Sequence, residues 1–439
     1  MIITWIAFLL LGFLSFIIKD APWFYENRNT VSWYIIFFLS LVFIISMFRK
    51  YNARDFDWIA LFVVFTGFFI RVFLLYWDLN FRHIFVLPNS GVDSEGFYAA
   101  ALGLTERRAG NFTRIMGWIF SLFGPQRYIA QFFNLLLGIS TIFISLNLLR
   151  KVTTNKNSTI LLLTVGILLP YYMIMNVIFL REALISFFVT CGLYFFISWF
   201  KDGKLWGMFL CMVCSLVVGL LHSGSIIVAL GFAVCFVLYD RKRKSFRVTS
   251  KTLLQGAFFF MMFFVFDIIF DDALFGRLLY ADVASLTTFA ERETGDSAYT
   301  FFIHTGVEAL DFLVNTPFRM LYFLFSPFPW YWRGPFDIIA FIFSAGFYIT
   351  SYIVAFLALR RKDVINKEYI VMFLILGLVN AFVFGWGVRN IGTAMRHRDK
   401  FLSIHLLLLT FSIHSLQVKS IIGQIRSLFY PRRNIALKD

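Results

Sequence analysis

The 439-residue chain is too apolar for a water-soluble protein, because 60% of its residues are hydrophobic, only 15% are charged and its mean hydropathy is +0.78. The net charge of +15 does not indicate nucleic-acid binding, because Lys and Arg lie mainly in short breaks between apolar segments, where they set membrane topology. Apolar stretches of about 17–25 residues recur, which is the length that a helix needs to cross a bilayer. The composition predicts an all-α, polytopic integral membrane protein and excludes a transmembrane β-barrel, whose strands are shorter and alternate in hydrophobicity.

Taken in chain order, the apolar segments predict about 12 transmembrane helices. The first segment has no basic n-region and no clear small-residue cleavage site, so we expect a mature helix rather than a signal peptide. Two further segments, 113–124 and 305–330, are too short or too polar to span and are predicted to be re-entrant or interfacial. The expected spans are 2–18, 31–48, 58–77, 126–149, 158–176, 183–200, 205–221, 224–239, 253–270, 335–359, 368–387 and 400–418.

Basic residues between these spans predict the topology. The positive-inside rule places the basic breaks, the basic tail 419–439 and both termini in the cytoplasm. The opposite face then carries two long external segments, 78–125 and 271–334, within one polytopic membrane domain, 1–439. The basic breaks are 49–54, 150–156, 201–204, 241–251 and 360–362.

The first external segment contains the acidic motif GVDSEGFY, with Asp93 and Glu95 two positions apart. On a turn or an extended segment both carboxylates can point toward one centre, where they can act as a general base or bind a divalent cation. The alternative is that Asp93 or Ser94 caps a helix that begins near Gly96. We expect the functional role.

Two ionisable residues lie at predicted helix ends on the same face: Arg181 in FLREALISFF and His222 in LLHSGS. An ionisable group at such a place is costly unless it faces a cavity or a partner, so both are candidates for ligand contact. The alternatives are a salt bridge or headgroup contact for Arg181, and a helix start capped by Ser223 or Ser225 around His222.

The segment GTAMRHRDK, before the last expected span, places Arg396, His397 and Arg398 on the external face, against the positive-inside tendency, with Arg389 nearby. A guanidinium is always charged and its planar set of donors matches phosphate oxygens. We therefore predict a phosphate or pyrophosphate site. The alternative is pairing with external carboxylates such as Asp282.

These four motifs, on the hydropathy layout of most of the chain, resemble bacterial polysaccharide polymerases of the EpsG and Wzy type and, more distantly, the wider GT-C membrane glycosyltransferases. The resemblance implies a GT-C-like helical membrane fold. The first external loop, 19–30, lacks the paired acids typical of classical GT-C enzymes, which argues against a protein-mannosyltransferase-like assignment.

The resemblance implies an enzyme in the bacterial cytoplasmic membrane that joins repeat units carried on undecaprenyl pyrophosphate at the outer face. The leaving pyrophosphate needs fixed cations, and Arg181, Arg389, Arg396, His397 and Arg398 are the expected ligands. The general base is expected to be Asp93, Glu95 or His222. No cofactor is expected, although the acidic pair permits a divalent cation. The expected partners are lipid-linked glycans, membrane lipids, and flippase and chain-length regulator proteins.

Two alternatives remain at this stage. A transporter or flippase for lipid-linked saccharides would show an internal repeat with interrupted helices, which the sequence does not display, although Arg71 and Asp267 lie deep in predicted helices. A GT-C glycosyltransferase that uses a polyprenyl-monophosphate sugar donor would have the same topology as a polymerase. A non-catalytic scaffold has no need for so many external arginines.

Overall fold

The structure, a computed structural model, describes residues 22–51, 57–105, 110–250, 252–258, 261, 301–361, 364 and 366–416. Helices account for most of these residues, and the strands in this part of the chain are the short antiparallel pair β1 (Tyr239–Asp240) and β2 (Ser245–Phe246). The expected span 2–18, most of the span 253–270 with Asp267, the carboxylate Asp282 and the tail 419–439 lie outside the described residues.

Six helical segments of the described chain are long and apolar enough to cross a membrane. Each contains an 18-residue window of mean hydropathy 1.9 to 2.3, so each can cover the hydrocarbon core of a bilayer. The architecture is therefore that of an α-helical membrane protein. The six segments belong to α2 (Pro22–Tyr51), α3 (Trp58–Asn80), α6 (Arg127–Arg150), α9 (Glu182–Asp202), the continuous stretch α15 (Pro335–Ile339), η3 (Ala340–Ala345) and α16 (Gly346–Leu359), and α17 (Lys367–Gly387).

Shorter apolar helices complete the bundle, and one of them corrects the sequence prediction. The expected span 158–176 is broken at Leu169, whose backbone is extended with ψ 113°. The cause is Pro170, which lacks an N–H and disfavours helical backbone at the residue before it. The shorter helices are α7 (Lys156–Leu168), α8 (Pro170–Met175), α10 (Leu205–Leu221), and η1 (Ser223–Ile226) with α11 (Ile227–Leu238).

The two segments expected to be re-entrant or interfacial form helices. Residues 113–124 belong to α5 (Asn111–Phe123), which at 13 residues is too short to cross a bilayer. Residues 305–330 contain α14 (Glu308–Phe325), which has Pro317 in its interior and is not among the six long apolar helices. Asn315 of α14 exchanges two hydrogen bonds with the backbone of Ile303, so the segment that precedes α14 is bound to this helix.

The C-terminal part of the described chain lies at the centre of the bundle. It consists of α18 (Ile391–Arg398), η4 (Asp399–Phe401) and α19 (Leu402–Leu416). Almost every residue of α19 is buried, and α19 contacts α16, α17, α7, α6 and α9. The buried hydroxyl of Thr190 on α9 donates to Ser403 at 2.9 Å. The expected last span is therefore a core helix surrounded by the others.

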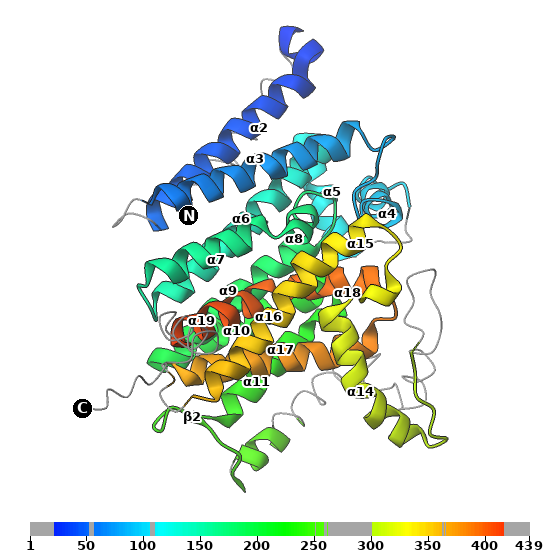
Figure 1. Cartoon of the computed structure of the whole chain (residues 1–439). Helices are drawn as coiled ribbons and strands as arrows, with labels where there is room; N and C mark the ends of the chain where they lie inside the picture. Colours follow the sequence, from blue (N-terminus) through cyan, green and yellow to red (C-terminus); the bar gives the residue numbers. More distant parts are fainter. Residues whose placement is uncertain are drawn as a thin grey trace, which may run out of the picture.

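The basic connections and the candidate residues lie at opposite ends of the bundle, and Figure 1 shows the elements that form each end. At one end lie the basic α6–α7 connection and the β1–β2 hairpin, and Lys201 in the last turn of α9 donates to the carbonyl of Lys151 at 2.7 Å. At the opposite end lie α18, α5 and the short helix α4 (Val92–Ala101). The candidate residues from distant parts of the sequence meet at this second end.

Candidate functional site

A cavity of about 390 Å³ lies between α4, α5, the start of α9 and α18. It brings together three residues that the sequence placed in separate external segments, namely Asp93, Arg181 and Arg396. Its wall is completed by aromatic and small residues. The lining residues are Asp93, Phe97, Gly110, Phe112, Thr113, Arg181 and Arg396.

Arg396 connects two carboxylates of different exposure. Its Nη1 donates to Oδ2 of Asp93 at 2.6 Å, and its Nε lies 3.1 Å from Oε1 of Glu182. The side chain of Asp93 is 44% exposed, whereas that of Glu182 is 2% exposed. Burial lowers the pKa of Arg396, but Glu182 and Asp93 raise it, so that the net shift is upward and the guanidinium stays charged.

Glu182 is a site residue that the sequence reasoning did not single out. It lies in the first turn of α9, directly after Arg181, and the Nζ of Lys400 is 3.8 Å from the same oxygen that faces Arg396. A buried carboxylate is tolerated when cations surround it. The sequence FLREALISFF could have indicated it, because Glu182 is an acidic residue at the start of an apolar stretch.

Arg181 occupies the N-cap position of α9 and lies over the ring of Phe97, with 5.4 Å from its guanidinium carbon to the ring centroid. Its Nη1 donates to the carbonyl of Leu221 at 3.1 Å, while its buried Nε has no hydrogen-bond partner among the described residues. Burial lowers the pKa of Arg181, and Glu182 opposes this effect. Arg181 therefore places a fixed cation at the cavity wall.

His222 forms the break between α10 and η1, behind the cavity wall. Its Nδ1 lies 3.0 Å from the hydroxyl of Ser225, and no side chain caps η1, so the capped-start alternative is not what the structure shows. Burial lowers the pKa of His222, and Lys400 and the two site arginines lower it further, which keeps the ring neutral at pH 7. His222 is not among the residues that line the cavity.

His397 lies next to His222 and is buried. The two imidazole centroids are 5.0 Å apart, and the Nδ1 of His397 is 2.6 Å from the Nζ of Lys400. Burial lowers the pKa of His397, as do the neighbouring cations, so this ring is also neutral. The contact between the rings of His222 and His397 connects α18 with the break between α10 and η1.

Three of the five expected phosphate ligands do not line the cavity: His397, described above, and Arg389 and Arg398. The guanidinium of Arg398 is fully buried and donates to the carbonyls of Leu324 and Ser326 at 3.0 and 2.6 Å and to the hydroxyl of Ser344 at 2.8 Å. It points toward the end of α14 and toward η3 rather than into the cavity, and its hydrogen bonds are those of a structural arginine. Arg389 is half-buried before α18 and does not line the cavity.

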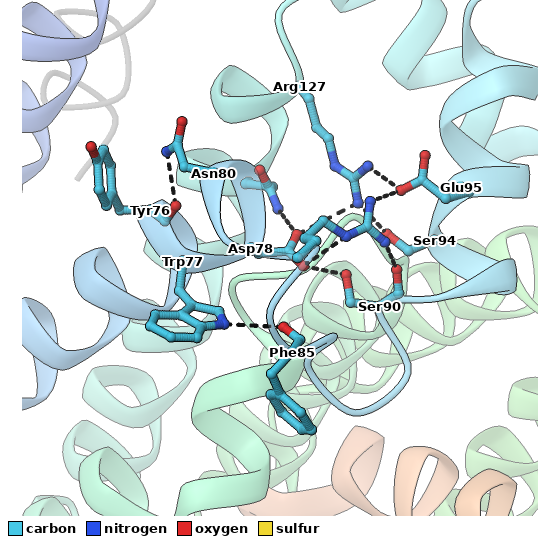
Figure 2. Close-up of polar contacts among 11 residues, drawn as sticks. Tyr76, Trp77, Asp78, Asn80, Phe85, Ser90, Ser94, Glu95 and Arg127 are labelled. Carbon is cyan, nitrogen blue, oxygen red and sulfur yellow. Dashed lines mark hydrogen bonds and ion pairs between the residues drawn. The ribbon is translucent and has the colours of Figure 1, made fainter.

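The expectation that both acidic residues face one centre is wrong, because GVDSEGFY is helical. Asp93 and Glu95 both lie in the first turn of α4. Residues that are two positions apart in a helix point in directions about 200° apart around its axis. Asp93 lines the cavity, whereas Glu95 makes ion pairs with Arg82 and Arg127 (Figure 2). Among the described residues no group of three or more His, Cys, Asp or Glu side chains is arranged to bind a metal ion.

Comparison with known proteins gives no match to a protein family, a curated protein or a solved structure. Two arginines and one half-exposed carboxylate face a cavity at one end of a membrane-spanning bundle, and a second carboxylate fixes one of the arginines from behind. Such a site can bind an anionic group and accept a proton beside it.

Proposed function

We propose that the protein is a polymerase-type glycosyltransferase that joins undecaprenyl-pyrophosphate-linked oligosaccharides at the outer face of the bacterial cytoplasmic membrane. The observation that carries this proposal is the convergence of Arg181, Arg396 and Asp93 on one cavity. A lipid pyrophosphate is an anionic leaving group attached to a membrane anchor, so its site requires fixed cations at the end of an apolar bundle. The resemblance to EpsG and Wzy polymerases supports the same reaction.

The distribution of charge supports the proposed orientation. The basic connections, including Lys151 and Lys201, meet at the end of the bundle opposite the cavity (Figure 1). With the positive-inside rule, that end faces the cytoplasm and the cavity faces outward. Arg181 and Arg396 are then external arginines whose role is in the site rather than in topology.

In the proposed reaction a sugar hydroxyl of one lipid-linked unit attacks the anomeric carbon of the glycan carried by a second lipid. The new glycosidic C–O bond forms as the bond between that carbon and the pyrophosphate oxygen breaks. The bonding electrons leave with the pyrophosphate, whose charge Arg181 and Arg396 stabilise. Asp93 accepts the proton of the attacking hydroxyl as general base.

The resting contact between Arg396 and Asp93 gives the proposed site a simple order of events. An arriving pyrophosphate competes with Asp93 for the donors of Arg396, because both are oxygen anions. Once displaced, the half-exposed Asp93 carboxylate is available to the acceptor hydroxyl. Glu182 keeps the other side of Arg396 in place throughout, since its contact is buried.

The test uses purified protein in lipid nanodiscs with a lipid-pyrophosphate-linked oligosaccharide. Wild type is expected to produce a ladder of longer glycans and to release undecaprenyl pyrophosphate. Arg396→Ala is expected to lose the ladder, whereas Arg360→Ala, an exposed arginine at the end of α16, serves as the matched control and keeps it. Absence of a ladder from folded wild type would contradict the proposal.

One observation favours the transporter alternative: the α7–α8 break interrupts a helix inside the bundle, as in many transporters. The purified protein, reconstituted into vesicles for this purpose, separates these functions. Movement of the lipid-linked glycan between vesicle leaflets without chain growth would indicate a transporter. Transfer of a single sugar from a polyprenyl-monophosphate donor would indicate the GT-C alternative.

A further inference from the structure

The side chain of Asp78, at the C-terminal end of α3, is fully buried and surrounded by donors (Figure 2). The hydroxyl of Ser90 donates to Oδ1, and Nε2 of Gln131 donates to Oδ2 at 2.7 Å. Two guanidinium groups lie within ion-pair distance, at 3.6 Å for Arg82 and 3.5 Å for Arg127. A carboxylate out of contact with water requires such partners.

The same two arginines continue from Asp78 to α4. Both donate to Oε1 of Glu95, and Nη2 of Arg127 also donates to the hydroxyl of Ser94 at 2.8 Å. Asp78, Arg82, Glu95 and Arg127 thus form a charge-balanced group, which we call the Asp78 cluster. It joins the end of α3, the first turn of α4 and the start of α6.

The cluster holds the side of α4 that faces away from the cavity. Glu95 belongs to the cluster and Asp93 lines the cavity, and the two are about 200° apart around the helix. Tyr98, one turn further along, extends this contact: its hydroxyl donates to the carbonyl of Pro125 at 2.9 Å, and Arg127 lies 5.5 Å from its ring centroid.

The position of α4 depends on such contacts, because a helix of 10 residues is too short to be stable by itself. Its N-cap residue, Gly91, provides no side-chain hydrogen bond. Arg127 is the more buried of the two arginines, since its side chain is only 11% exposed, and it contacts both Asp78 and α4. Arg82 is 23% exposed and lies on the more solvated side of the cluster.

We infer that Arg127, acting through Asp78 and Glu95, is a positioning residue that sets the location of Asp93 beside Arg396. This inference rests on the proposed function. Arg127 does not line the cavity, yet it contacts Ser94 and Glu95 in the first turn of α4, and the proposed general base is in that turn. A displacement of about 1 Å at a reacting group costs on the order of 100-fold in rate.

The test is a double-mutant cycle in the nanodisc polymerisation assay. It uses wild type, Arg127→Ala, Asp93→Glu, which keeps a carboxylate and measurable activity, and the double variant. Arg127→Ala is expected to lower kcat about 100-fold with KM changed by less than about 3-fold. In the Asp93→Glu background, Arg127→Ala is expected to cause less than about a 3-fold further loss, because residues that act together are not additive.

Arg127→Lys is measured in the same cycle, because it keeps a positive charge beside buried Asp78 and so protects folding. It is expected to restore part of kcat, since one ammonium replaces the charge but not the planar set of donors that reaches Asp78, Ser94 and Glu95 together. If the loss of kcat caused by each Arg127 variant is the same with Asp93 as with Asp93→Glu, the two effects are independent. That result, in active enzyme, would overturn the positioning role and leave the proposed function standing. Wild type that makes no ladder would overturn both.

Discussion

At the scale of single residues, the site depends on one buried carboxylate. Glu182 has Arg396 at 3.1 Å and Lys400 at 3.8 Å, and it is almost completely removed from solvent. A buried charge pair that loses one partner leaves the other uncompensated, which is among the more destabilising changes in a protein interior. Glu182 therefore determines both the stability of the site and the direction of the Arg396 guanidinium.

Glu182→Gln is expected to lower the free energy of unfolding by about 3–5 kcal/mol, because Arg396 and Lys400 lose their buried counter-charge. The measurement is the thermal unfolding midpoint in nanodiscs at fixed lipid composition. Glu308→Gln, an exposed acid in the first turn of α14, is the control and is expected to change the midpoint little. Equal midpoints for wild type and Glu182→Gln would contradict the account of the buried pair.

The lowered pKa of His222 predicts a dependence of stability on pH. Burial keeps the folded ring neutral, whereas in the unfolded chain the same ring binds a proton below about pH 6.5. The unfolded state then binds more protons, so stability falls as pH decreases, with a slope that approaches about 1.4 kcal/mol per pH unit below pH 6.5 for this group. Between about pH 6.5 and 5.5, wild type should lose about 1 kcal/mol more than His222→Gln. Parallel stability curves for the two proteins would exclude this origin.

At the scale of elements, two of the differences between the predicted and the observed site have one physical cause. The sequence analysis treated Asp93 with Glu95, and Arg396 with Arg398, as neighbours pointing to one centre. In each case the segment is helical, in α4 and in α18, so residues two positions apart face different surroundings. Charge and hydropathy point to both segments, but only the backbone conformation determines which member of each pair reaches the cavity.

The two arginines of α18 are therefore expected to respond differently to substitution. Arg398→Ala removes donors from the carbonyls of Leu324 and Ser326 and should lower the unfolding midpoint, at a cost of about 1–3 kcal/mol for each buried group left unsatisfied. Protein that remains folded should keep the wild-type KM for the lipid-linked substrate. A large rise in KM for Arg398→Ala would instead place this residue in substrate binding.

At the scale of the whole molecule, the sequence predicts the positions of the long helices better than it predicts the contacts between side chains. Hydropathy predicted the long apolar helices, and external placement predicted that Asp93, Arg181 and Arg396 share one end of the bundle. The break at Leu169 was missed, because the apolar pattern continues across Pro170 and hides the change of backbone. The burial of Glu182 could not be predicted, since it depends on α18 returning to the start of α9 from more than 200 positions later in the chain.

The proposed orientation of the bundle predicts opposite accessibility at its two ends. In protein with its four cysteines replaced, a thiol reagent that does not cross membranes should label Leu104→Cys, an exposed position after α4, in intact cells. It should label Lys244→Cys, an exposed position in the β1–β2 hairpin, only after permeabilisation. The reverse pattern would show that the cavity faces the cytoplasm.

The most direct test of the central claim compares glycan chain growth by wild type, Arg396→Ala and Arg360→Ala in nanodiscs with a lipid-pyrophosphate-linked oligosaccharide. We expect wild type and Arg360→Ala to produce the same ladder and to release undecaprenyl pyrophosphate. Arg396→Ala should slow chain growth by about 10²–10³-fold, as expected when a main contact to developing charge is lost. Chain growth by folded Arg396→Ala at the wild-type rate would contradict the assignment of this cavity as the pyrophosphate site.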